Sequence, residues 1–188
     1  MLFLKVSNFF HARAKTKAIL WPILLIIILF VILKILSVYF PESMSTVSLD
    51  DPVFYTPEEI YNILETWGEN QRNLELWFHI TWDFLLPISV FFILGISISW
   101  LYQRAIKPES KWQKLNLIAF AVVFDLFENL FLVILIINYP NHLIIIAWIK
   151  SIVTISKYLL IIPIALIILI GIIKAGKNKF KNQANKIQ

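Results

Sequence analysis

Long apolar runs alternate with short polar segments along the chain. Four of these runs approach or exceed twenty residues, the length that an α-helix needs to cross a bilayer. They cover residues 19–40, 76–102, 115–137 and 143–173. Because lipid leaves every backbone polar group to be satisfied internally, each run is predicted to be a helix. We therefore predict an all-α fold, an integral membrane four-helix bundle whose membrane domain covers residues 18–173.

The first run follows a basic segment, so a signal peptide is the competing interpretation. Residues 1–17 carry four basic side chains and no acid. The stretch from Ser37 to Pro41 offers no small-x-small cleavage site, and the basic leader is long for a signal peptide. We expect an uncleaved first span, preceded by a short basic amphipathic helix at the lipid surface.

A shorter amphipathic helix is predicted between the first two spans, over residues 57–68. Thr56 supplies a cap, Pro57 occupies the first turn, and Glu59 closes a capping box. Apolar residues then recur at helical spacing, and Gly68 can end the helix. This helix either covers the mouth of the bundle or packs on neighbouring helix ends.

The composition agrees with lipid as the solvent. The chain is 59% hydrophobic and 15% charged, with a mean hydropathy of +0.77, whereas a soluble domain carries about 25% charged residues. The absence of cysteine excludes disulfides, thiolate nucleophiles and cysteine-ligated metals. The basic residues responsible for the net charge of +5 lie in short clusters beside the apolar runs. The sequence shows no groove that combines basic and aromatic residues. We therefore predict that the chain interacts with the lipid bilayer and does not bind nucleic acid.

The charge clusters also predict an orientation. The leader at residues 1–17, the loop Arg104–Lys114 and the tail at residues 174–188 are basic. The loop and short helix from Pro41 to Glu75 carry eight acids and one arginine. Because basic loops stay on the cytoplasmic side, we predict a multi-pass protein of the cell membrane with both termini in the cytoplasm.

Polar residues interrupt the last three spans at helical spacing. They are His79 and Asp83 in the second span, Asp125, Glu128 and Asn129 in the third, and Lys150, Thr154 and Lys157 in the fourth. Within each span they share one helix face. Counting about 1.5 Å per residue from the outer ends places the acids and lysines in one layer, roughly 12 to 20 Å deep. We therefore expect one polar site where three helices meet.

Two details sharpen this expectation. Pro87 removes the helical hydrogen bond to the carbonyl of Asp83. Because lipid supplies no donor, another helix or water must satisfy that carbonyl. Three acids face two lysines, so one carboxylate lacks a base, and we expect Asp125 or Glu128 to hold a proton at neutral pH.

Ionisable groups at this depth are costly and commonly functional, whereas hydrogen bonds that only join helices are worth on the order of 1 kcal/mol each. The eight polar residues predict a site that binds or moves a small polar solute, a proton or a lipid headgroup. A second hypothesis is an intramembrane acid/base enzyme acting on a lipid, with Asp125, Glu128 and Lys157 as catalytic candidates. A third is a structural subunit whose charges only pair. The sequence does not separate these three.

No cofactor is predicted, and the neighbouring lysines argue against a metal ion at these acids. Transport by only four spans would require a homo-oligomer.

These elements together resemble a family of uncharacterised four-helix multi-pass membrane proteins of bacteria and archaea. The matching motifs are Asp-x3-Pro from Asp83, Asp-x2-Glu-Asn from Asp125 and Thr-x2-Lys from Thr154, preceded by the segment Tyr55–Glu59 and by Gly68 with Arg72. The resemblance covers residues 55–158. It implies a four-helix fold and carries no established activity.

Overall fold

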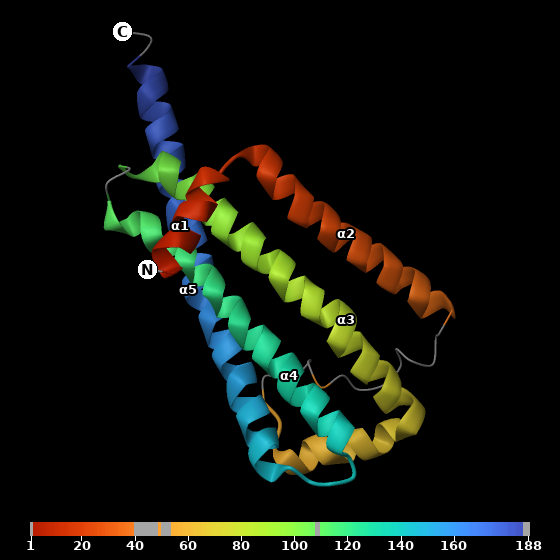
Figure 1. Cartoon of the computed structure of the whole chain (residues 1–188). Coiled ribbons are helices and arrows are strands. Elements are labelled where there is room, and N and C mark those ends of the chain that lie inside the picture. Colours follow the sequence, from red (N-terminus) through yellow and green to blue (C-terminus); the bar gives the residue numbers. More distant parts are fainter. Residues whose placement is uncertain (1, 40–48, 50–53, 108–109, 186–188) are drawn as a thin grey trace. The chain divides into compact units, whose positions relative to one another are not determined.

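The computed structural model describes residues 2–39, 49, 54–107 and 110–185 (Figure 1). Within these ranges the chain is helical apart from short connections, and no strand occurs. The helices are α1 (Leu2–Ala12), α2 (Thr16–Tyr39), α3 (Pro57–Ala105), the 3₁₀ helix η2 (Lys111–Val122), α4 (Val123–Asn138) and α5 (Ile144–Ala184). The prediction of an all-α chain is confirmed for the part that the structure describes.

Among the described residues, three stretches are long and apolar enough to cross a membrane: Pro57–Ala105, Lys111–Asn138 and Ile144–Lys181. They cover the last three predicted spans except for Leu143, the first residue of the fourth. A shorter apolar stretch, Ile23–Ile32, lies within α2, where the first span is predicted. The third span is not one regular helix, because it begins as η2 and continues as α4. α5 runs past residue 173, so most of the predicted basic tail is helical.

Some predicted features lie outside the described residues. They are residues 40–48 and 50–53 of the acidic segment, Pro108 and Glu109 of the basic loop, and residues 186–188 of the tail.

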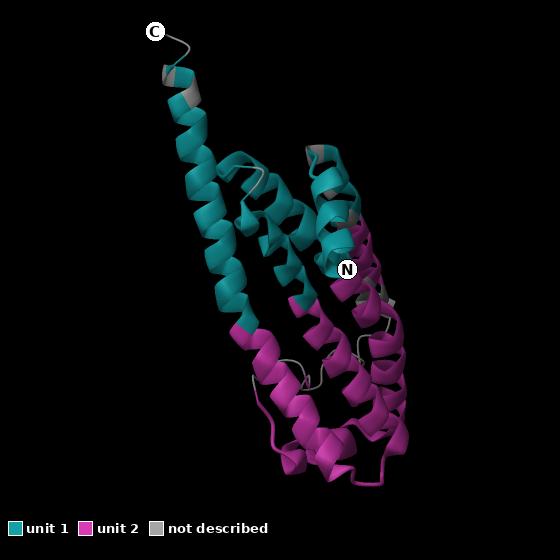
Figure 2. Cartoon of the chain, turned by 60° about the vertical axis from the view of Figure 1, so that its left-hand side comes forward, with its two compact units in different colours: residues 1–24, 89–120, 160–188 teal, residues 25–88, 121–159 magenta. Residues whose placement is uncertain are grey.

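The chain divides into two compact units (Figure 2). Unit 1 comprises residues 1–24, 89–120 and 160–188, and unit 2 comprises residues 25–88 and 121–159. Each unit has its own apolar core. In unit 2 the core includes Ile60, Leu64, Trp67, Leu132, Leu135 and Ala147. In unit 1 two clusters form around Phe10, Ile96 and Ala119, and around Ile98, Leu101 and Tyr102.

The start of α3 is the predicted capping box. The backbone N–H and the hydroxyl of Thr56 both donate to Glu59 Oε2, at 2.7 and 2.9 Å. The N–H of Glu59 donates in return to Thr56 Oγ1 at 3.3 Å. These bonds, chiefly the backbone bond from Thr56, hold the pKa of Glu59 below its ordinary value. The predicted helix start at residue 57 is confirmed.

The short helix ends at Gly68, as predicted, and the chain turns there. Gly68 has φ 65° and ψ 178°, a conformation that only glycine adopts readily. Arg72, one turn later, donates from Nη1 to the carbonyl of Leu64 at 2.8 Å. Its guanidinium also stacks on the ring of Tyr139, 4.2 Å from the centroid. Arg72 therefore fixes the corner that Figure 1 shows in the orange-to-yellow part of α3.

The predicted N-terminal helix is present as α1, but one of its faces is buried within unit 1. Ser7 and Phe10 are fully enclosed. A Cβ at Gly95 of α3 would overlap the ring of Phe10, so this close approach needs a glycine. At the start of the helix, Leu2, Phe3 and Leu4 are exposed. The sequence predicted an amphipathic helix at a lipid surface and did not foresee its docking on α3.

We predict that Gly68→Ala lowers the free energy of unfolding by more than about 1 kcal/mol, because alanine disfavours a positive φ. No atom lies within 4 Å of a Cβ at this position, so the variant would report backbone strain alone. Gly176→Ala is the matched control, since its Cβ also meets nothing and its backbone is helical. The control should be neutral or stabilising. Equal stabilities of the two variants in detergent unfolding experiments would contradict the assigned corner.

Candidate functional site

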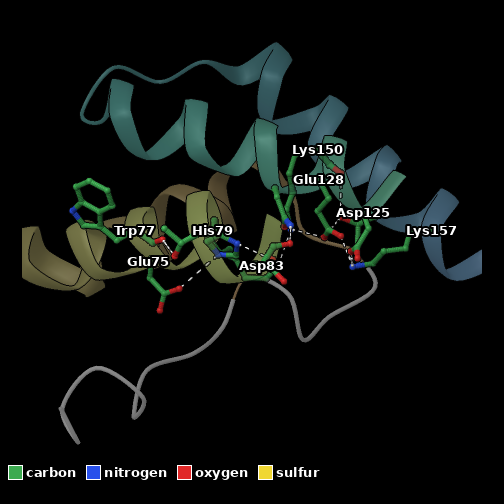
Figure 3. Close-up of polar contacts among 12 residues, drawn as sticks. Glu75, Trp77, His79, Asp83, Asp125, Glu128, Lys150 and Lys157 are labelled. Carbon is green, nitrogen blue, oxygen red and sulfur yellow. Dashed lines mark hydrogen bonds and ion pairs between the residues drawn. The ribbon is translucent and has the colours of Figure 1, made fainter. Parts of the chain in front are cut away.

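The polar residues predicted from the sequence lie together in unit 2. α3 supplies His79 and Asp83, α4 supplies Asp125, Glu128 and Asn129, and α5 supplies Lys150, Thr154 and Lys157. Figure 3 shows Lys150, Glu128, Asp125 and Lys157 directed toward one another from α4 and α5. All eight residues make contacts with at least one other member, either through side chains or through a backbone carbonyl.

Glu128 is the most enclosed acid of the site, with a side chain that is 0% exposed. Its Oε1 accepts a hydrogen bond from the hydroxyl of Thr154 at 2.6 Å and lies 3.3 Å from Nζ of Lys150. Its Oε2 pairs with Nζ of Lys157. All three partners lie on the one face of α5 that their spacing predicted. Both oxygens of this buried carboxylate are therefore held by α5.

Lys157 joins this enclosed acid to a more accessible one. Its Nζ also donates to Asp125 Oδ1 at 3.0 Å. The side chains of Lys157 and Asp125 are 25% and 28% exposed. Asp83 of α3 lies near enough to Asp125 to interact with it electrostatically. The site thus has an enclosed end at Glu128 and an accessible end at Asp125.

Lys150 lies on the other side of Glu128 and is 1% exposed. Its Nζ donates to the carbonyl of Leu49 at 2.7 Å. The neighbouring Ser151 hydroxyl donates to the carbonyl of Tyr55 at 2.5 Å. Leu49, Tyr55 and Ser151 were missed in the sequence, since a backbone carbonyl carries no residue-specific signal. Leu49 and Tyr55, which precede α3 in the chain, therefore contact α5 beside the site.

The carbonyl that Pro87 leaves without a helical donor is satisfied as predicted. Asn129 of α4 donates from Nδ2 to the backbone oxygen of Asp83 at 2.7 Å. Asn129 is 2% exposed, and Pro87 is fully buried. Asn129 therefore joins α4 to α3 at the point where the α3 ladder is interrupted.

His79 changes the balance of charge that the sequence predicted. It is 2% exposed, and its Nδ1 lies 3.0 Å from Asp83 Oδ2. Its Nε2 lies 3.6 Å from Oε2 of Glu75, one turn earlier, which was not among the predicted site residues. His79 is therefore a third possible base, but it contacts two acids, Glu75 and Asp83. With Glu75 included, four acids face three possible bases, and the expectation that one carboxylate holds a proton stays a prediction.

Within the described residues, no group of three or more His, Asp and Glu side chains is arranged to hold a metal ion. Comparison with protein-family models, with curated proteins and with solved structures gave no match to this chain. The resemblance to four-helix membrane proteins stays a prediction.

We predict that Asn129→Leu lowers the free energy of unfolding by about 1–3 kcal/mol, because the buried carbonyl of Asp83 loses its donor. Pro87→Ala restores a backbone N–H four residues after Asp83. In that background Asn129→Leu should therefore cost less, a coupling that a double-mutant cycle measures. Asn73→Leu, at an exposed α3 position, is the control. An identical cost of Asn129→Leu in both backgrounds would show that the amide does not serve this carbonyl.

We predict that Glu128→Leu costs about 3–5 kcal/mol, because the buried ammonium of Lys150 loses its carboxylate. Lys157 keeps Asp125 as its partner, so adding Lys150→Met should recover most of the loss. The free energies of unfolding of these variants are measured in one detergent. The exposed Glu65→Leu serves as control and should change little. Full stability of Glu128→Leu would contradict a dependence of unit 2 on this ion pair.

Proposed function

We propose that this chain is a multi-pass membrane protein of the cell membrane whose acid–lysine network takes up and releases a proton. Four spans, including α2, and cytoplasmic termini belong to the proposal, as does the four-helix bundle of the family that it resembles. The observation that carries it is the position of Lys157 between the enclosed Glu128 and the accessible Asp125.

Charge is divided unequally between the two units. The chain has 17 lysines and arginines and 12 acids, and unit 1 contains 13 of the basic residues and only one acid, Glu109. Unit 2 therefore contains the other four basic residues and 11 acids. Because basic segments stay in the cytoplasm, this division supports cytoplasmic termini and an extracytoplasmic position for the start of α3.

A proton fits this network better than a larger solute does. Two ammonium groups and one hydroxyl already occupy both oxygens of Glu128, so no carboxylate oxygen there is left for a solute. A proton needs no such space. When Asp125 takes a proton from hydronium, an O–H bond of the hydronium breaks and leaves water, a new O–H bond forms on Asp125, and the carboxylate charge is lost. Lys157, still an ammonium, then interacts more strongly with Glu128.

Asp83 and His79 give the network a second proton acceptor on α3. The imidazole of His79 lies 3.0 Å from Asp83, and Asp83 interacts electrostatically with Asp125. Imidazole changes charge near neutral pH more readily than any other side chain. A carboxylate, an imidazole and two further carboxylates linked by lysine form a series of groups suited to proton exchange.

One observation favours a second candidate function, acid/base chemistry on a lipid. Asp125 and Lys157 are the more exposed members of the site, so a lipid in the surrounding bilayer can reach an acid and an ammonium together. This enzyme hypothesis requires product formation from a lipid, which proton binding alone does not. The structural hypothesis requires only the ion pairs.

Infrared titration of carboxyl groups in the purified full-length protein tests the proposal. As the pH falls, the carbonyl band of a protonated acid should appear, together with proton uptake by the protein. Asp125→Asn should abolish this band, and Lys157→Met should shift its midpoint to higher pH, because Asp125 loses its ammonium partner. Glu65→Gln, at an exposed position, should leave the titration unchanged.

Absence of any titrating carboxyl band in the wild-type protein would overturn proton exchange and leave the structural hypothesis. A band that persists in Asp125→Asn would overturn the role of that residue. The enzyme hypothesis would instead gain support from turnover of membrane lipid that Asp125→Asn abolishes and Glu65→Gln preserves.

A further inference from the structure

Unit 1 contains a cavity of about 680 Å³. Residues of α1, of the end of α3, and of the start of η2 line it, together with Ser110, which precedes η2. Leu4 and Ser7 line it from α1, Gln103 lines it from α3, and Lys111, Gln113 and Lys114 line it from η2. None of these residues belongs to the acid–lysine network, which lies wholly in unit 2. The cavity is therefore a separate candidate site.

The charge of the lining suits an anion. Lys111 and Lys114 both line the cavity and are exposed, and no aspartate or glutamate is among the described residues that line it. Unit 1 as a whole is strongly basic, with 13 lysines and arginines to one acid. Two neighbouring ammonium groups attract a phosphate group.

The side-chain oxygen of Gln113 is an acceptor that needs a hydrogen-bond donor from a ligand. Its Nε2 donates to the carbonyl of Tyr102 at 3.0 Å and lies 3.4 Å from the carbonyls of Ile106 and Lys107. Because these oxygens can only accept, the amide cannot turn over without losing all three contacts. Gln113 is 7% exposed, and its Oε1 finds no donor among the described residues. A buried acceptor in this position is stabilised by a ligand that brings a hydroxyl group.

The third property is an apolar surface beside the cavity. Leu4 lines the cavity and is 49% exposed, and its neighbours Leu2 and Phe3 are 68% and 59% exposed. Exposed apolar side chains next to a lysine, here Lys5, are typical of a helix that lies at a membrane surface. Acyl chains can therefore continue along α1 from a headgroup that lies in the cavity.

We propose that this cavity binds the headgroup of an anionic phospholipid that carries hydroxyl groups, such as a phosphatidylglycerol. Lys111 and Lys114 contact the phosphate, Gln113 Oε1 accepts a hydrogen bond from a headgroup hydroxyl, and Leu4 borders the acyl chains. The inference relies on the membrane placement proposed above and is independent of proton exchange in unit 2. The shared chemistry, a phosphate with adjacent hydroxyls, also occurs in soluble glycerol phosphate.

Calorimetric titration of the delipidated full-length protein in detergent tests the proposal. The titrants are short-chain phosphatidylglycerol, short-chain phosphatidylpropanol, glycerol phosphate and inorganic phosphate. Phosphatidylglycerol should bind about tenfold more tightly than phosphatidylpropanol, which has the same charge and no hydroxyl. The two soluble phosphates should bind more weakly than either lipid, because they lack acyl chains.

Protein variants locate the site. Lys111→Met with Lys114→Met should weaken phosphatidylglycerol binding by about tenfold or more. Lys177→Met with Lys181→Met removes the same charge from exposed positions of α5 outside the cavity, so binding should fall far less. The comparison of the two lipids leaves Gln113 intact, so it tests the hydroxyl without disturbing the three carbonyls that Gln113 holds.

Each result has a definite meaning. Equal affinities for the two lipids would overturn the hydroxyl contact. Glycerol phosphate that binds as tightly as phosphatidylglycerol would make the ligand a soluble phosphate and overturn the lipid assignment. Equal losses in the two lysine pairs would overturn the cavity as the site and indicate non-specific attraction to a basic surface. Loss of proton exchange with intact lipid binding would contradict only the function proposed for unit 2.

Discussion

The buried carboxylate of Glu128 is the constraint on which unit 2 depends. An ionised carboxylate removed from water is strongly disfavoured unless charged and hydrogen-bonding partners surround it. Thr154, Lys150 and Lys157 supply those partners from one face of α5. A rotation or a shift of α5 by one residue would separate the three groups from Glu128. The ion pairs therefore set the register of α4 against α5, which apolar side chains alone would specify weakly.

The corner of α3 and its proline have one feature in common, a backbone carbonyl that accepts a hydrogen bond from a side chain. Gly68 and Pro87 each interrupt the helix, and each interruption lies next to a backbone carbonyl that a distant side chain satisfies. Arg72 donates to Leu64 at the corner, and Asn129 donates to Asp83 at the proline. Buried or lipid-facing carbonyls without donors are costly, so helix breaks of this kind need such partners. Both donors also link α3 to α4 or its end, because Arg72 stacks on Tyr139, the residue after α4, and Asn129 belongs to α4.

The two units carry different chemistry because their charges differ. Unit 2 contains most of the acids, which surround the buried Lys150 and the more accessible Lys157, and this arrangement suits exchange of a small cation such as the proton. Unit 1 contains most of the basic residues and a cavity whose described lining includes two lysines and no acid, which suits a phosphate. The same asymmetry is the basis of the proposed orientation, because basic segments stay in the cytoplasm. Charge distribution thus relates the topology of the chain to both proposed sites.

The sequence by itself determined the positions of the long apolar helices, the capping box and the end of the short helix, because these depend on neighbours within a few residues. It did not indicate the 3₁₀ start of the third span. It also placed the acids and lysines in one layer, since helical rise and spacing are fixed. Tertiary structure alone decided that Glu128, and not Asp125, is the enclosed acid, and that His79 is buried against Asp83. It also brought Leu49 to Lys150 and docked Phe10 on Gly95. Such contacts join residues far apart in the chain, and no local preference of either partner specifies them.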